Sequence, residues 1–290
     1  MQTTGASVLV PTFGAPDLAA RGCSRTTQLS SLALALLLAA MSLVAIVHPA
    51  LYRHETPSYA AQALGQDWAD LLVGAPWLVV AARTARRGSR RGQLLLGGGL
   101  AYALYEFLIY AFAVHFNGLF LVYCAGLGLS VLALVTMLAH LTREDVRSWF
   151  VTGAPLRGPA AFLFALGVMF AFAWLSEVVP ALVRGTVPAS ILEAGLLTNP
   201  VHVIDLSLLL PAHFAAGVLA FRRHAAAYAL APVLLAFDVL MSLSIAAVAL
   251  GMFMLGLTTT LSITWVMLML CLASASLLTR LLADLCSQEQ

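Results

Sequence analysis

Long apolar runs constrain the fold of this chain more than any other feature. About 20 consecutive apolar residues are enough to cross a hydrocarbon core about 30 Å thick. Eight runs of this kind occur, near residues 30–50, 67–83, 94–115, 118–139, 159–180, 200–221, 227–249 and 256–279. Hydrophobic residues fill 61% of the 290 positions and only 10% are charged, a composition typical of membrane proteins and not of water-soluble domains. We therefore predict an all-α, multi-pass membrane bundle of about eight helices.

The run at 67–83 is the weakest of the eight. Asp67, Asp70 and Pro76 interrupt it, and it needs the preceding residues 61–64 to reach a full membrane span. Residues 52–70 are accordingly interpreted as a connection outside the membrane that leads into this helix.

The arginines predict the orientation of the bundle. All fifteen cationic side chains are arginines. With a cytoplasmic N-terminus, thirteen of them fall inside: Arg21, Arg25, Arg83, Arg86, Arg87, Arg90, Arg91, Arg143, Arg147, Arg157, Arg222, Arg223 and Arg280. Only Arg53 and Arg184 fall outside. Positive charge collects on the cytoplasmic side, so we expect cytoplasmic tails at 1–29 and 281–290 around a single bundle at 30–280. The Ala-, Leu- and Arg-rich composition suggests a bacterial inner membrane.

Several classes of function are disfavoured by composition. A retinal Schiff base needs a lysine amine, and the chain has no lysine. A net charge of +2 argues against a nucleic-acid partner. The four cysteines, at 23, 124, 271 and 286, lie in tails or apolar helices and do not suggest a disulfide framework. Haem is not expected either, because only His202 and His213 lie well inside predicted helices.

The stretch 198–213 places two histidines and an aspartate in an apolar helix. Asn199 is a favourable N-cap and Pro200 a favourable first helical residue. At about 100° per residue, His202 and His213 lie about 20° apart on the helical wheel, and Asp205 lies about 60° from His202. We therefore predict that all three share one face.

A second polar stripe lies on the third predicted helix. Tyr102, Glu106 and Tyr110 repeat every four residues, which places them on one face. A carboxyl group facing lipid at this depth is costly, so this face is predicted to point into the bundle. Asp238 lies near the middle of the seventh predicted helix and is a secondary candidate.

Polar residues from several predicted helices are expected at similar depth, towards the outer ends of the helices. They are Asp70, His115, Asn117, Tyr123, Glu177, Asn199, His202 and Asp205. Charged residues cost about 2.5–3.5 kcal/mol each at mid-membrane, so their clustering predicts a shared polar pocket open to the periplasm, which Glu106 and Tyr110 extend inward. Residues 188–195, in the longest outer loop, are predicted to form a short helix or lid.

Three interpretations of this pocket remain open. The first is a transporter-like site that handles protons or a small solute, because a histidine in the first turn of a helix is held neutral and can accept a proton. The second is a metal-dependent, hydrolase-like enzyme in which His115, Glu177, His202 and Asp205 bind zinc or a similar transition metal. The third is a sensor or assembly subunit in which the polar residues only link helices.

Three short motifs carry a resemblance to other proteins. They are Gly-Gln-Asp-Trp at 65–68 with Pro-Trp at 76–77, Arg-Gly-Ser-Arg-Arg-Gly-Gln-Leu-Leu at 87–95, and Asn-Gly-Leu-Phe-Leu-Val-Tyr at 117–123. With these motifs the chain, from Gly65 to about Pro232, resembles a group of bacterial multi-pass membrane proteins of unassigned activity. The resemblance implies the fold and no particular function. No sequence motif is repeated between the two halves of the chain.

Overall fold

The structure, a computed structural model, describes residues 22–286. Its secondary structure consists of helices and one isolated β-bridge between Phe150 and Leu285. Seven of the described helices are long and apolar enough to cross a membrane. They are Arg25–Val47 (α1), Arg90–Ala113 (α4), Phe120–Leu141 (α5), Arg157–Arg184 (α6), Pro200–Phe221, Ala227–Met254 (α10) and Ser262–Ala283 (α11). The predicted all-α class is confirmed, and the seven helices are compatible with a multi-pass membrane protein.

A further helical rod lies between α1 and α4 and is not among these seven. It runs through Pro57–Ala69 (α2), the π-helical segment Asp70–Gly74 (η3) and Ala75–Arg86 (α3). Most of the connection predicted at 52–70 is helical, because α2 covers Pro57–Ala69. Helix α2 begins at Pro57 because the Thr56 side chain accepts a hydrogen bond from the Tyr59 N–H and proline suits a first helical turn.

Shorter elements join the long helices. They are Pro49–Tyr52 (η2), Val146–Trp149 (η4) and Ala189–Ala194 (α7). Helix α7 confirms the short helix predicted within 188–195. Two predicted boundaries shift, since α6 continues through Pro180 to Arg184 and α11 begins only at Ser262.

The predicted tails are only partly described, because residues 1–21 and 287–290 lie outside the described range. Within that range both tails are shorter than expected. Helix α1 begins at Arg25, where the Ser24 side chain accepts a hydrogen bond from the Thr27 N–H. At the other terminus, Cys286 N–H donates to the Trp149 carbonyl.

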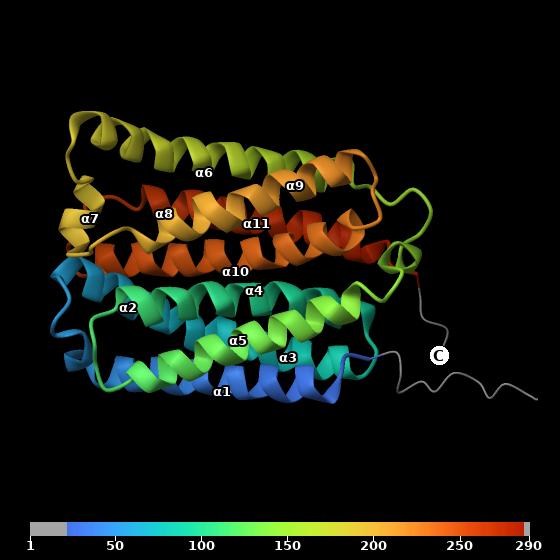
Figure 1. Ribbon diagram of the computed structural model, residues 1–290, viewed down its shortest axis with the longest axis horizontal. Helices are drawn as coiled ribbons and strands as arrows, with labels where there is room; N and C mark the ends of the chain where they lie inside the picture. Colours follow the sequence, from blue (N-terminus) through green and yellow to red (C-terminus); the bar gives the residue numbers. More distant parts are fainter. Residues whose placement is uncertain (1–21, 287–290) are drawn as a thin grey trace, which may run out of the picture.

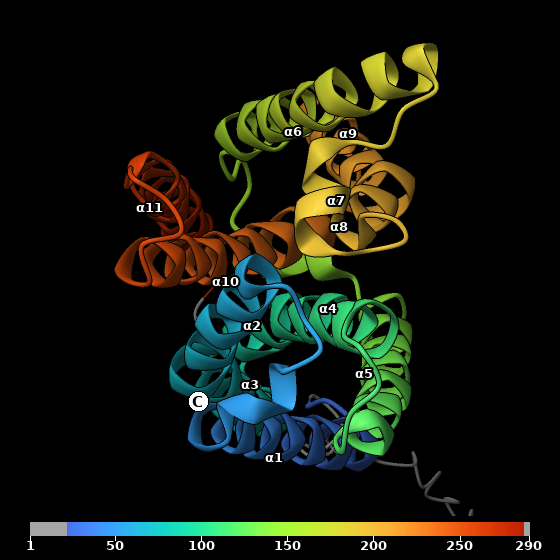
Figure 2. The same ribbon diagram turned by 90° about the vertical axis from the view of Figure 1, so that its left-hand side faces the viewer.

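The two halves of the chain repeat the same order of helices. The first half contains α1, the α2–η3–α3 rod, α4 and α5. The second contains α6, the rod formed by Pro200–Ile204 (α8), Asp205–Leu209 (η5) and Leu210–Phe221 (α9), then α10 and α11. Figure 2 shows α1 to α5 as a ring on one side, with α6 and α9 on the other and α10 between them. The structure therefore reveals a correspondence that no sequence motif indicated.

The rod of each half contains a π-helical segment that begins with an aspartate. Asp70 opens η3 and Asp205 opens η5, and a proline follows six residues later in each case, at Pro76 and Pro211. A proline ring clashes with the carbonyl of the residue four positions earlier and offers no N–H. A wider π turn just before the proline accommodates this defect.

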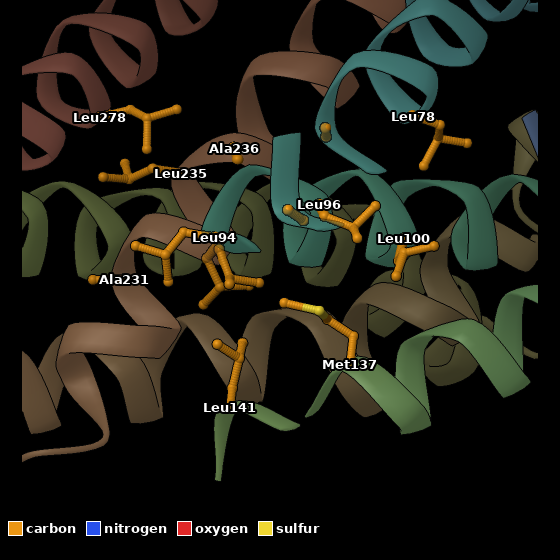
Figure 3. Packing of buried hydrophobic residues seen from close by; sticks show 14 of the residues in the cluster. Leu78, Leu94, Leu96, Leu100, Met137, Leu141, Ala231, Leu235, Ala236 and Leu278 are labelled. Atoms are coloured by element: carbon orange, nitrogen blue, oxygen red, sulfur yellow. The ribbon is translucent and has the colours of Figure 1, made fainter. Parts of the chain in front are cut away.

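The contact between the halves depends on small residues of α4. A Cβ atom built on Gly98 would lie 2.5 Å from Ala236 Cβ and 2.7 Å from the Val233 carbonyl oxygen of α10. The two helices approach this closely only because glycine has no side chain. Leucines of α4, among them Leu94 and Leu96, are fully buried at the same crossing, between α10 and α5 (Figure 3).

Arginine-rich turns gather at one end of the bundle. Four contacts connect them: Cys23 N–H to the Ala85 carbonyl, Arg90 over the Trp149 ring at 5.7 Å, Arg147 over the Tyr228 ring at 5.9 Å, and Cys286 N–H to the Trp149 carbonyl. The start of α1 and the end of α11 therefore lie at this same end, as the trace shows (Figure 1). The opposite end carries α7 and the loop between α1 and α2.

Candidate functional site

A cavity of about 470 Å³ lies between the two halves of the bundle. Helices α2, α4, α6, α10 and α11 and the α8–η5–α9 rod supply its wall, and α7 lies at its rim. Most lining side chains are apolar or aromatic. The polar side chains that matter for the argument are Gln66, Glu106, Glu193, Asp205, His213 and Asp238.

Glu106 is the most unusual residue of this cavity. Only 3% of its surface is exposed, and no hydrogen bond to its carboxyl group is found among the described residues. The charged groups that interact with it electrostatically are two other carboxyls, those of Asp70 and Asp67. Tyr102 and Tyr110 of the same stripe are also buried, so the prediction that this face of α4 points inward is confirmed.

The neighbouring Asp67 is fully partnered. Its two carboxylate oxygens accept hydrogen bonds from the Tyr52 hydroxyl at 2.7 Å and the Tyr110 hydroxyl at 2.9 Å. Burial and the adjacent Asp67 carboxylate raise the pKa of Tyr52 well above its usual value, so the Tyr52 hydroxyl remains a donor. The Tyr110 ring stacks on Tyr123 with ring centroids 5.3 Å apart.

Asp70 is held by a second network around Gln66. The Tyr102 hydroxyl donates to Asp70 Oδ1 at 2.6 Å, and Gln66 Nε2 donates to the same oxygen at 3.2 Å. The Gln66 side-chain oxygen accepts from the Ser244 hydroxyl of α10. Asp70 Oδ2 is buried and has no hydrogen-bond partner within residues 22–286. The π segment that begins at Asp70 thus places a carboxyl group at the junction of α2, α4 and α10.

Asp205 lies at the corresponding start of η5 and is also partnered. Tyr105 of α4 donates its hydroxyl to Asp205 Oδ1 at 3.1 Å, and Trp174 of α6 donates its indole N–H to Oδ2 at 2.8 Å. The Tyr105 bond connects the two halves of the bundle, and the Trp174 bond holds Asp205 within the second half.

His213 and Asp238 form a buried pair in the cavity wall. His213 Nδ1 lies 2.8 Å from the Leu209 carbonyl oxygen, and Nε2 lies 2.9 Å from Asp238 Oδ1. A carbonyl only accepts, so Nδ1 must carry a proton, and one further proton lies between Nε2 and the carboxyl group. The pair therefore has no net charge, whichever partner holds that proton. Asp238 Oδ2 is buried and finds no hydrogen-bond partner in the described part of the chain.

His202 and His213, which were predicted to share one face with Asp205, have different surroundings in the structure. His202 stacks on Trp174 at 4.6 Å and lies 3.8 Å from Glu177 Oε2 of α6. It lines a separate hollow of about 500 Å³ beside α7, whereas His213 contacts Asp238 of α10. The intervening η5 segment departs from the rotation of 100° per residue on which the prediction rested.

The metal site predicted from His115, Glu177, His202 and Asp205 is not assembled. His115 Nδ1 lies 2.8 Å from Glu55 Oε2, and Asp205 is occupied by its tyrosine and tryptophan donors. Among residues 22–286, no group of three or more His, Cys, Asp or Glu side chains is placed to hold a metal ion. Residues at a similar depth in the membrane on different helices need not meet, because depth does not determine the direction in which each side chain points around its helix axis.

Asn117 lies away from the cavity as well. Its side-chain oxygen accepts from the Leu119 N–H at 2.9 Å, and its amide lies 3.4 Å from the Tyr123 hydroxyl. It shapes the turn between α4 and α5.

No family model, curated protein or solved structure matches the chain.

Several residues of the site were not predicted. They are Tyr52, Gln66, Asp67, Tyr105, Trp174 and Glu193. One pattern could have identified part of this set, because Gln62, Gln66 and Asp70 repeat every four residues, like the stripe on α4. Interpreting 52–70 as a connection outside the membrane hid that periodicity. Tyr105 and Trp174 had no comparable pattern.

Proposed function

We propose that this chain is a transporter-like membrane protein that binds a small solute in the central cavity and couples binding to a proton on Glu106. In this proposal it has eight spans, lies in a bacterial inner membrane with both termini in the cytoplasm, and takes its solute from the periplasmic side. The observation that carries the proposal is Glu106, a buried residue whose carboxyl group has no hydrogen-bond donor among the described residues and which lines a cavity of about 470 Å³.

The coupling follows from the cost of burying charge. An ionised carboxylate without a partner is strongly disfavoured in an apolar environment, and such a group becomes neutral by holding a proton. Asp67 has two hydroxyl donors, whereas Glu106 has no donor among the described residues. Glu106 is therefore the carboxyl group of this region whose proton is most sensitive to what enters the cavity.

Helix α7 supplies a cover at the arginine-poor end. The Ser58 hydroxyl of α2 donates to Glu193 Oε1 at 3.1 Å, and the Ser190 N–H donates to Glu177 Oε1 of α6 at 3.1 Å. Ser190 and Glu193 also line the cavity. Few bonds hold this short helix in place, which favours entry of a solute beneath it.

Proton coupling can be measured in proteoliposomes loaded with a pH-sensitive dye. A panel of cationic, neutral and anionic solutes is added outside, and we expect at least one to change the internal pH with wild-type protein. Glu106→Gln should abolish that solute-dependent change, because the amide has no exchangeable carboxyl proton. Glu144→Gln, in an exposed turn after α5, is the matched control and should behave as wild type. Proton movement that is unaffected by Glu106→Gln would contradict the proposal, and no movement with any solute would favour a sensor or assembly subunit.

The eight-span topology is a separate prediction. If the Pro57–Arg86 rod crosses the membrane, reporters fused after Glu55 and after Arg91 should report opposite sides, with Glu55 periplasmic and Arg91 cytoplasmic. Fusions after Arg157 and Arg223 should be cytoplasmic, and fusions after Asn117 and Ala189 periplasmic, because the arginines concentrate at one end of the bundle. Reporters at Glu55 and Arg91 on the same side would rule out this span.

A further inference from the structure

We infer that the solute of the central cavity is a hydrophobic organic cation that exchanges with the proton of Glu106. This inference rests on the proposed function and adds the chemical class of the solute. Three independent features of the described cavity support it: the sign of its charges, the partnering of its carboxyl groups and the nature of its walls.

The cavity favours positive charge. Four carboxyl groups line it, those of Glu106, Glu193, Asp205 and Asp238. Among the described lining residues, the basic side chain is His213, and its pair with Asp238 is neutral. No arginine is among the described lining residues to neutralise an anion. A cation therefore gains electrostatic energy on entering, and an anion loses it.

Two carboxyl groups of the cavity wall have unused acceptor capacity. Glu106 accepts no hydrogen bond from any described residue, and Asp238 Oδ2 is buried without a partner in the same part of the chain. Both side chains line the cavity from facing helices, α4 and α10. A buried polar atom without a partner indicates a missing ligand or a functional role.

The rest of the wall suits hydrocarbon. Tyr105, Phe170, Trp174 and Phe237 contribute aromatic rings, and aliphatic and methionine side chains fill much of the remainder. Aromatic faces attract organic cations. A bare metal ion would need several oxygen ligands, and the described residues offer no group of three acidic, His or Cys side chains placed for one. The cavity volume of about 470 Å³ lies in the range of sites for small organic molecules.

The exchange balances in charge and protons. In the empty cavity Glu106 carries its proton; when the cation enters, that proton leaves to water and the carboxylate pairs with the cation, so the net charge of the cavity is unchanged. Six described groups interact electrostatically with Glu106, and each is a carboxyl or a tyrosine hydroxyl: Asp67, Asp70, Tyr59, Tyr102, Tyr105 and Tyr110. None of them supplies a competing positive charge.

Two ions of matched shape and opposite charge test this inference. Tetraphenylphosphonium and tetraphenylborate are titrated calorimetrically into the full-length protein in lipid nanodiscs, in two buffers with different heats of ionisation. We expect tetraphenylphosphonium to bind and release about one proton, and tetraphenylborate not to bind. Glu106→Gln should weaken cation binding by about tenfold or more and abolish proton release. Glu144→Gln should bind as wild type does.

A second measurement avoids variants that fail to fold. A carbodiimide modifies protonated buried carboxyl groups, so mass spectrometry of treated wild-type protein should find Glu106 modified, and saturating tetraphenylphosphonium should protect it. Equal protection by tetraphenylborate, or cation binding that survives Glu106→Gln unchanged, would overturn the inference.

The failure of this inference is distinguishable from failure of the proposed function. If neutral or anionic solutes drive Glu106-dependent proton movement while tetraphenylphosphonium does not bind, the cation inference is wrong and the coupled function stands. If tetraphenylphosphonium binds with proton release but no solute moves protons across vesicles, the cation site stands and the transport proposal is wrong.

Discussion

Leucine in place of His213 is expected to lower the free energy of unfolding by about 3 kcal/mol, the scale for removing one partner of a buried pair. Without His213, neither oxygen of Asp238 has a hydrogen-bond partner among the described residues, because Oδ1 loses His213 and Oδ2 already has none. The same reasoning applies to Asp238→Leu, which leaves His213 Nε2 without its acceptor. Each single variant thus buries a polar group that the fold no longer satisfies.

Replacing both residues should recover most of the loss. The double variant His213→Leu with Asp238→Leu removes donor and acceptor together, and the neighbouring wall is already mostly apolar, so we expect strong non-additivity in the double-mutant cycle. Unfolding of the purified protein in detergent, followed by circular dichroism, measures each step. His48→Leu, exposed after the end of α1, controls for the change in residue type. Additive losses would show that the two side chains act independently and contradict the pairing.

Alanine at Gly98 is expected to destabilise the protein although alanine favours helices. The added Cβ would lie 2.5 Å from Ala236 Cβ, 2.7 Å from the Val233 oxygen and 2.9 Å from the Phe237 nitrogen. Two of these atoms belong to the α10 backbone, so the helices must move apart. Overpacking of this kind costs about 1–3 kcal/mol. The loss should exceed the gain of at most about 1 kcal/mol from replacing a helical glycine.

Gly128 of α5 provides the matched control for Gly98. A Cβ atom there would meet nothing within 4 Å, so Gly128→Ala should keep or slightly raise the thermal unfolding midpoint, while Gly98→Ala lowers it. Because α4 and α10 carry Glu106 and Asp238, we also expect Gly98→Ala to weaken solute binding in the central cavity. Equal midpoints for the two variants would show that the α4–α10 crossing is not tightly packed.

The sequence alone determined the class of protein and part of its site. Apolar runs of membrane-spanning length can be identified directly in the sequence, and the structure has helices at all of them. The stripe of Tyr102, Glu106 and Tyr110 was predictable, because a polar repeat every four residues on an apolar helix has one low-cost direction, towards the interior. The short helix at 188–195 was predictable for similarly local reasons.

Only the tertiary structure decided which of these polar residues meet. Periodicity fixes the relative direction of side chains on one regular helix, but it gives neither the rotation of one helix against another nor the effect of a π-helical insertion. For this reason His213 was not matched with Asp238, and His115 was assigned to a metal site when its partner is Glu55. Packing also decided the most consequential difference, that Asp67 receives two tyrosine hydroxyls and Glu106 receives no donor among the described residues. A carboxyl group's partners lie on other helices, so its charge and its availability to a ligand are properties of the assembled bundle.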